Sequence, residues 1–164
     1  MIIKIAEDHD LPYIAHACRE FMTESNWLGL LTLSTENIYS TLLHMLEDPD
    51  SLIVVAYDDN GDVGGFTFWG LENPWTVEKL GIEILFYVRP QCRKSSMAKH
   101  MLDFAVNLCK DMGARLLYSS STAGFDDDGR NARAYNALLR RQGFKELPHS
   151  AFLVMTTGDT DGQD

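Results

Sequence analysis

The segment RPQCRKSSMAKH, residues 89–100, gathers residue types that can bind an anion. It follows the apolar run GIEILFYV and leads into a helical pattern. The first turn of a helix presents unpaired backbone N–H groups and a partial positive charge, and Arg93 and Lys94 add full charges beside it. Ser95 and Ser96 add hydroxyl donors. The pattern predicts a site for a phosphate-like group, and an ordinary helix start capped by one of the serines is the alternative.

One carboxylate interrupts the apolar run that precedes this segment. Glu83 is the only acidic residue in residues 79–88, and an unpaired carboxylate is costly to bury. Such a group could take a proton from a substrate, directly or through water, or it could pair with a neighbouring cation such as Lys79. Strand alternation predicts that Glu83 shares a face with Leu85 and Tyr87, and a bulge would change that parity.

Two periodicities alternate along the chain and predict the elements that position these residues. Helical spacing follows Asp8 or Asp10, either of which is a predicted cap of the first helix. It recurs over residues 35–48, where Ser34 or Thr35 is the predicted cap, and over residues 96–112 and 131–142. Strands are predicted over residues 1–6, 51–58, 63–72, 79–88, 114–121 and 150–157, with a hairpin signal at Asn60-Gly61. The order β-α-α-β-β-β-α-β-α-β predicts a mixed α/β fold in which an antiparallel meander leads into a β-α-β unit.

Length and composition favour one domain, residues 1–157, followed by an acidic flexible tail, residues 158–164. The chain has 164 residues, of which 45% are hydrophobic, so it can bury one full core. Its formal net charge of −10 argues against a general nucleic-acid binder, which needs clustered Lys and Arg. This acidity favours cationic partners, and a general contribution to solubility is the stronger alternative. The sequence has no membrane span or signal-peptide core, which predicts a cytoplasmic protein. Its cysteines and histidines lack metal-ligand spacing, so we expect no metal site.

Two motifs about 40 residues apart carry a resemblance to a known family. In FYVRPQCRKSSMAKHML, Arg93, Ser96 and Ala98 occupy the positions where the GCN5-related N-acetyltransferase (GNAT) superfamily has Arg or Gln, then Gly, then Gly or Ala. The second motif, NARAYNALLRRQGF, is similar to the family's helix that begins with Asn131 and runs into a Gly-Phe pair. The chain therefore resembles a GNAT protein, possibly a tailed-phage-like member, and the resemblance implies a mixed sheet of six to seven strands with about four helices.

The same resemblance implies acetyl-CoA as cosubstrate. Its pyrophosphate would contact the loop and first helical turn, and its pantetheine arm would pair with a strand that leaves its neighbour at a bulge. Backbone N–H groups are the main donors in such a loop, so serine can replace glycine there. The residues expected at the cofactor are Phe86, Val88, Arg93, Lys94, Ser95, Ser96, Met97, Ala98, Lys99 and Asn131.

Acetyl transfer to a primary amine, on a small molecule or a protein lysine, is the activity that the resemblance implies. Glu83 is the candidate general base. The family places a proton-donating tyrosine where this chain has Leu139, and Tyr135 lies one helical turn earlier on the same face, so Tyr135 is the candidate acid; a packing tyrosine is the alternative. The missing tyrosine leaves a second possibility, a catalytically weakened GNAT-fold protein that binds and modulates a partner protein.

Aromatic and apolar residues are the candidates for acceptor binding. Trp27 and Leu28 lie between the first two predicted helices, a region that borders the acceptor pocket in this superfamily, and core packing or a dimer contact is an equal alternative. Trp69 lies near the end of the third predicted strand and could line the same cleft. The expected partners are acetyl-CoA and an amine acceptor, possibly a protein, with no nucleic acid and no membrane. We expect a monomer or a homodimer in a cytoplasm, the host's if a phage encodes the protein.

Overall fold

The computed structural model describes residues 1–25, 33–72, 77–120, 130–147 and 151–155. Its helices are α1 (Leu11–Glu24), α2 (Thr35–Glu47), α3 (Met97–Asp111) and α4 (Arg130–Arg141), with short 3-10 helices η1 (Asp8–Asp10) and η3 (Pro90–Cys92). Its strands are β1 (Ile2–Ile5), β2 (Ser51–Tyr57), β3 (Val63–Glu72), β4 (Lys79–Val88), β5 (Ala114–Ser120), β6 (Lys145–Leu147) and β7 (Ala151–Met155). The predicted tail, residues 158–164, lies outside the described residues.

The strands form one mixed sheet in the order β1-β2-β3-β4-β5-β7-β6. Strands β4 and β5 pair in parallel, with α3 as the crossover between them, and the other described pairs are antiparallel. The mixed α/β fold and its element order are therefore confirmed. Strand β6 was not predicted, because three residues after Gly143 are too few to show a periodicity.

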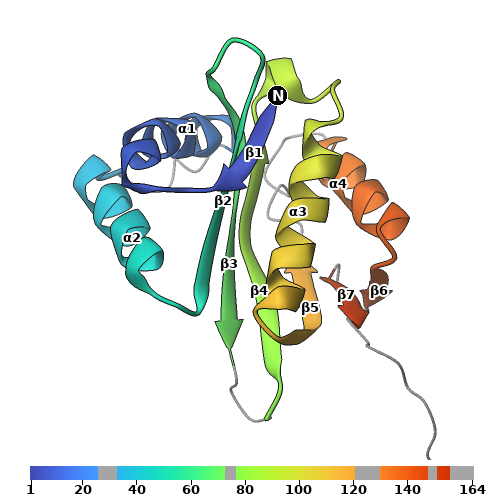
Figure 1. Ribbon diagram of the computed structural model, residues 1–164. Helices are drawn as coiled ribbons and strands as arrows, with labels where there is room; N and C mark the ends of the chain where they lie inside the picture. Colours follow the sequence, from blue (N-terminus) through green and yellow to red (C-terminus); the bar gives the residue numbers. More distant parts are fainter. Residues whose placement is uncertain (26–32, 73–76, 121–129, 148–150, 156–164) are drawn as a thin grey trace, which may run out of the picture.

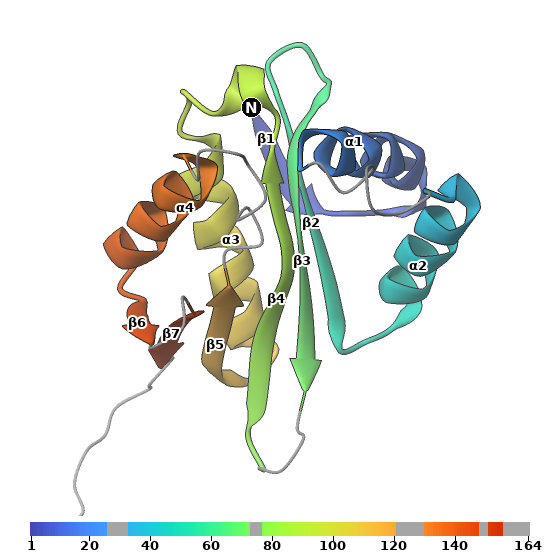
Figure 2. The ribbon, with the colours of Figure 1, turned by 180° about the vertical axis from the view of Figure 1, so that it is seen from behind.

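Helices cover both faces of the sheet (Figures 1 and 2). Helices α1 and α2 pack on one face, and α3 packs on the other with α4 beside it. Each helix pair buries its own apolar cluster against the sheet. The first cluster includes Ile14, Leu42 and Phe66, and the second includes Met101 and Leu117, all with less than 2% of their surface exposed. A core on each face fixes the sheet between two layers, so features of the central strands can hold a site rigidly.

Polar side chains define how the two N-terminal helices begin. The Ser34 hydroxyl accepts a hydrogen bond from the N–H of Asn37, which is the predicted cap of α2. Asp10 acts differently from the predicted helix cap: its carboxylate is fully buried, accepts the N–H of Glu7 and pairs with Lys4 at 2.9 Å. The Asp10 side chain thus fixes the end of β1 to the start of α1.

A bulge in β4 changes which side chains share a face. Phe68 pairs with Leu85 and the next residue, Trp69, pairs with Glu83, so Ile84 is the extra residue. Leu85 and Tyr87 consequently pack in the α1 and α2 cluster, whereas Glu83 lies opposite Trp69, in the α3 cluster. The expectation that Glu83 shares a face with Leu85 and Tyr87 is therefore wrong, because the bulge reverses the alternation.

The sheet opens between β4 and β5 just before this bulge. The last pair in their ladder is Ile82 with Tyr118, and no later pair joins these two strands in the described residues. β4 nevertheless continues to Val88, while β5 keeps its pairing to β7. The sheet therefore has an internal edge in its middle.

Within the described part of the chain, no helix is long and apolar enough to cross a membrane.

Candidate active site

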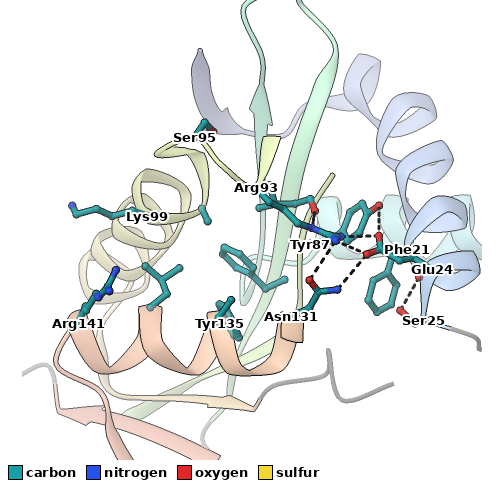
Figure 3. A pocket seen from close by; sticks show the side chains of 15 residues that line it. Phe21, Glu24, Ser25, Tyr87, Arg93, Ser95, Lys99, Asn131, Tyr135 and Arg141 are labelled. Atoms are coloured by element: carbon teal, nitrogen blue, oxygen red, sulfur yellow. Dashed lines mark hydrogen bonds and ion pairs between the residues drawn. The ribbon is translucent and has the colours of Figure 1, made fainter. Parts of the chain in front are cut away.

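A cavity of about 320 Å³ lies beside the open stretch of β4 (Figure 3). It is bounded by the C-terminal end of α1, by β4, by the loop and first turn of α3, and by one face of α4. The lining side chains are Phe21, Glu24, Ser25, Phe86, Tyr87, Val88, Arg93, Ser95, Ala98, Lys99, Asn131, Ala134, Tyr135, Leu138 and Arg141. Three separate stretches of the chain, residues 21–25, 86–99 and 131–141, thus build one pocket.

Most of the expected cofactor residues meet in this pocket, and three do not. Its wall includes Phe86, Val88, Arg93, Ser95, Ala98, Lys99 and Asn131. Lys94 and Ser96 are exposed and outside the lining, and Met97 is buried in the core, where its side chain would meet any Cβ added to Gly64. Helical geometry explains this split, because only one face of the first turn of α3 can point toward β4. For these three residues a contact with the cofactor stays a prediction, since the loop can also offer its backbone N–H groups.

Ser95 organises the loop that enters α3. Its hydroxyl donates to the carbonyl oxygen of Cys92 at 2.6 Å and accepts the N–H of Met97 at 3.2 Å. Ser96 stands at the N-cap position but its side chain caps no backbone N–H. Ser95 therefore stabilises the entry to α3 from the position before the N-cap, and it also lines the pocket.

Arg93 connects three elements around the pocket. Its Nε donates to the carbonyl oxygen of Val88 at 2.8 Å, and its Nη atoms lie 2.5 Å and 2.7 Å from the two carboxylate oxygens of Glu24. Tyr87 and Asn131 also donate to Glu24, at 3.2 Å and 3.3 Å. Figure 3 shows these three side chains pointing at the Glu24 carboxylate, with Lys99 and Arg141 on the opposite side. The pocket therefore has a cationic side and a side occupied by a carboxylate.

The environment of Glu24 favours its charged form. Burial opposes ionisation, but the hydrogen bonds and positive charge of Arg93, with the hydrogen bonds of Tyr87 and Asn131, lower the pKa of Glu24 below its ordinary value. Four donor contacts on one carboxylate leave it fully satisfied in this arrangement.

Glu83 and Tyr135 form a direct hydrogen bond behind the pocket wall. The Tyr135 hydroxyl donates to Glu83 Oε2 and lies 3.4 Å from the Ser119 hydroxyl. Glu83 is 3% exposed, and burial raises its pKa to about 8, against the opposing effect of hydrogen bonds from Tyr135 and Ser119. Burial also raises the pKa of Tyr135 well above its ordinary value. Lys79 pairs instead with Asp50, at 2.6 Å, so the alternative of a Lys79–Glu83 pair is wrong.

Tyr135 separates Glu83 from the pocket. Its ring stacks on Phe86 with the centroids 4.6 Å apart, and both residues line the cavity, whereas Glu83 does not. Any proton that moves between the pocket and Glu83 along these side chains passes through the Tyr135 hydroxyl. Leu139, at the family's tyrosine position, is fully buried in the α3 cluster.

The predicted acceptor residues have different outcomes. Trp69 is fully buried in the core beneath α3 and is absent from the pocket wall, so its predicted contact with an acceptor is wrong. The reason is that its strand position faces a helix that covers it on folding. Trp27 and Leu28 lie outside the described residues.

Within the described chain, no three His, Cys, Asp or Glu side chains gather as a metal site.

Glu24, Tyr87, Ser119 and Arg141 also belong to the site or contact it, and the sequence patterns did not predict them. Helical spacing could have found two of them. Glu24 follows Phe21 by three residues on the apolar face of α1, where a carboxylate needs a partner. Arg141 continues the face of α4 that carries Asn131, Ala134, Tyr135 and Leu138. Tyr87 and Ser119 gave no local signal, because their positions depend on the bulge and on the pairing of β5.

Comparisons with known proteins agree on the fold. The ribosomal-protein-alanine N-acetyltransferase from Brucella melitensis superposes with a TM-score of 0.73 at 19% identity, over 94% of this chain and 99% of that one. A predicted acetyltransferase with acetyl-CoA from Clostridium acetobutylicum gives 0.68 at 14% identity, over 90% and 92% of the two chains. A GNAT acetyltransferase from Streptococcus pneumoniae gives 0.65 at 14% identity, over 93% and 96%. A comparison with curated protein sequences gives no match.

A family model confirms the predicted resemblance to the GNAT superfamily. The model described as an acetyltransferase (GNAT) domain matches residues 49–146, which is more than half of the chain. The matched stretch contains the open edge of β4, the loop into α3 and all of α4. The three structures named above come from bacteria, so the likeness to tailed-phage members stays a prediction. The chain belongs to the GNAT acetyltransferase family.

Proposed function

We propose that this protein is an acetyl-CoA-dependent N-acetyltransferase that acts on a primary amine. The observation that carries the proposal is the opening between β4 and β5, which leads into a pocket bounded by the N-terminus of α3. Lys99 and Arg141 give this pocket cations suited to phosphate groups. Phe86 and Leu138 give it apolar walls. These features fit a ligand with an anionic end and a long, mainly apolar arm.

The edge of β4 supports the same ligand. From Glu83 to Val88 this strand runs without a ladder to β5, so its backbone can pair with the amides of a pantetheine arm as with an added strand. The partial positive charge at the start of α3 complements a diphosphate at Ser95 and Ala98. Bound there, acetyl-CoA would supply an activated acetyl group and a thiolate leaving group.

Glu83 and Tyr135 provide a proton relay for this chemistry. When the amine nitrogen bonds to the acetyl carbon, the carbon–sulfur bond breaks, the nitrogen must lose a proton and the thiolate must gain one. Tyr135, at the pocket wall, accepts the nitrogen's proton while passing its own to ionised Glu83. The reverse transfer then protonates the thiolate, and the relay returns to its starting state. The amine's proton thus ends on sulfur.

The relay predicts the pH dependence of turnover. Glu83 must be ionised at the start, and its pKa is about 8, so the rate should rise with pH through that value. Glu83→Gln should keep acetyl-CoA binding, lower turnover by about a hundredfold and lose this acid limb. Tyr135→Phe should show the same pattern, because it interrupts the same path. If Glu83 had only a structural role, Glu83→Gln would lower the stability of the fold, and the pH profile of the remaining activity would be unchanged.

Calorimetry tests the cosubstrate separately from the chemistry. Acetyl-CoA is titrated into the native protein, Lys99→Glu and Lys110→Glu. Lys99 lines the pocket, whereas Lys110 is exposed near the other end of the same helix and makes the same charge change. Lys99→Glu should weaken binding by about fivefold or more, and Lys110→Glu should bind like the native protein. Equal weakening by both variants would contradict this placement.

Transfer is then measured as release of free CoA thiol with a panel of diamines, polyamines, amino acids and lysine peptides. We expect release above the hydrolysis background with at least one amine. Binding of acetyl-CoA without release for any of them would favour the alternative, a GNAT-fold protein that binds and modulates a partner without catalysis.

A further inference from the structure

The Glu24 carboxylate is held by groups that the anionic cosubstrate would also attract. Arg93 reaches it with both Nη atoms, at 2.5 Å and 2.7 Å, and Asn131 and Tyr87 complete its contacts. Both charged side chains are about 30% exposed, so the ion pair lies at the pocket surface and can be broken. Figure 3 shows Arg93 between this carboxylate and the side of the pocket that carries Lys99 and Arg141.

From this arrangement we infer that Glu24 binds a second cationic group of the acceptor, which is therefore a diamine or polyamine. The inference rests on the proposed acetyl transfer. When the diphosphate of acetyl-CoA draws the Arg93 guanidinium, Glu24 loses its cation and keeps its negative charge inside the pocket. An ammonium group of the acceptor then replaces the guanidinium, and Tyr87 and Asn131 hold the carboxylate in place.

The position of Glu24 relative to the relay requires a second amine rather than the reacting one. Asn131, which donates to Glu24, lies one helical turn before Tyr135 on the same face of α4. A carboxylate would keep a bound amine protonated and unreactive, so the reacting nitrogen belongs beside Tyr135. We expect an acceptor with two amino groups separated by a short methylene chain to occupy both positions, since Glu24 and Tyr135 line the same pocket.

The charge of the molecule agrees with this class of acceptor. The chain carries a formal net charge of −10, which raises the local concentration of small cations. Among the described residues that line the pocket, Glu24 is the carboxylate, beside the cations Arg93, Lys99 and Arg141. A diamine that enters after acetyl-CoA therefore meets one strong site for its distal ammonium.

Calorimetry with acetyl-CoA tests whether the cosubstrate draws Arg93 away from Glu24, a step called the exchange below, without measuring turnover. The variant is Glu24→Gln, and the matched control is Glu20→Gln, which breaks the ion pair of α1 with Arg89 outside the pocket. Because Glu24→Gln removes the competitor for Arg93, it should bind acetyl-CoA about three- to fivefold more tightly than the native protein. Glu20→Gln should bind like the native protein. Unchanged or weaker binding by Glu24→Gln would overturn the exchange.

Kinetics with matched acceptors tests the second cationic group. The native protein should have a KM for 1,4-diaminobutane about tenfold lower than for 1-aminobutane, and Glu24→Gln should lose this difference with kcat largely retained. An equal KM for both amines in the native protein, or a preference that survives in Glu24→Gln, would refute the assignment. If the native protein binds no acetyl-CoA, the proposed function itself fails, whereas equal binding by native protein and Glu24→Gln refutes the exchange alone.

Discussion

Replacing Glu83 with glutamine tests the burial of this carboxyl group while keeping a hydrogen-bond acceptor for Tyr135. Burial raises the pKa of Glu83 from its ordinary 4.5 to about 8. Between these values the folded protein binds more protons than the unfolded chain, so the free energy of unfolding falls as the pH rises. A difference of this size corresponds to at most about 5 kcal/mol between pH 4.5 and pH 9. Glutamine resembles the protonated carboxyl group and does not titrate, so the free energy of unfolding of the variant should not fall in this way as the pH rises.

The assay is urea unfolding, followed by tryptophan fluorescence at pH 5, 7 and 9. The native protein and Glu83→Gln should have similar stability at pH 5, and the variant should become the more stable one by several kcal/mol at pH 9. Glu72→Gln, at the exposed end of β3, is the control for loss of a carboxylate and should follow the native protein. If the native protein and Glu83→Gln showed the same pH dependence, Glu83 would titrate normally in the folded protein, and the reasoning about its burial would be refuted.

Three further substitutions test parts of the fold that support the site. Asp10→Asn should lower the free energy of unfolding by about 2 to 3 kcal/mol, because it weakens the buried contacts that join β1 to α1; a loss below 0.5 kcal/mol in urea unfolding would argue against this role. Gly65→Ala should cost about 1 to 3 kcal/mol by the same measurement, since its Cβ would lie 2.8 Å from the carbonyl oxygen of Tyr87, and a neutral effect would contradict that close approach. Leu139→Tyr should destabilise the core by about 1 to 3 kcal/mol without raising thiol release, whereas a faster enzyme would show that the family's tyrosine position is still usable.

The sequence predicted the elements well because each has a strong local signal. The hairpin at Asn60-Gly61, the cap at Ser34 and the helical spacing of α3 are set by neighbouring residues, and their boundaries agree with the structure to within one or two residues. Strand β6 lacked such a signal, since three residues cannot display a period. The element order and the family motifs then predicted the mixed sheet.

The candidate site was harder to predict because it depends on contacts between distant elements. The motifs found the loop from Arg93 to Lys99 and the helix that carries Tyr135. They could not find the partner of Arg93, because Glu24 is 69 residues away and meets it only through tertiary packing. The bulge at Ile84 likewise decides the face of Glu83, and it depends on register with β3. Trp69 was misassigned for a similar reason, since only the packing of α3 shows that it is buried.

The central claim is that acetyl-CoA binds along the open edge of β4 and at the start of α3. The most direct measurement is an NMR titration of the ¹⁵N-labelled native protein with acetyl-CoA, observing the backbone amides. We expect the largest shifts to cluster at residues 86–88, 95–99 and 131–141, while amides of β1 and of α2 change little. An absence of shifts at saturating acetyl-CoA, or a cluster centred on α2 and β1, would contradict it.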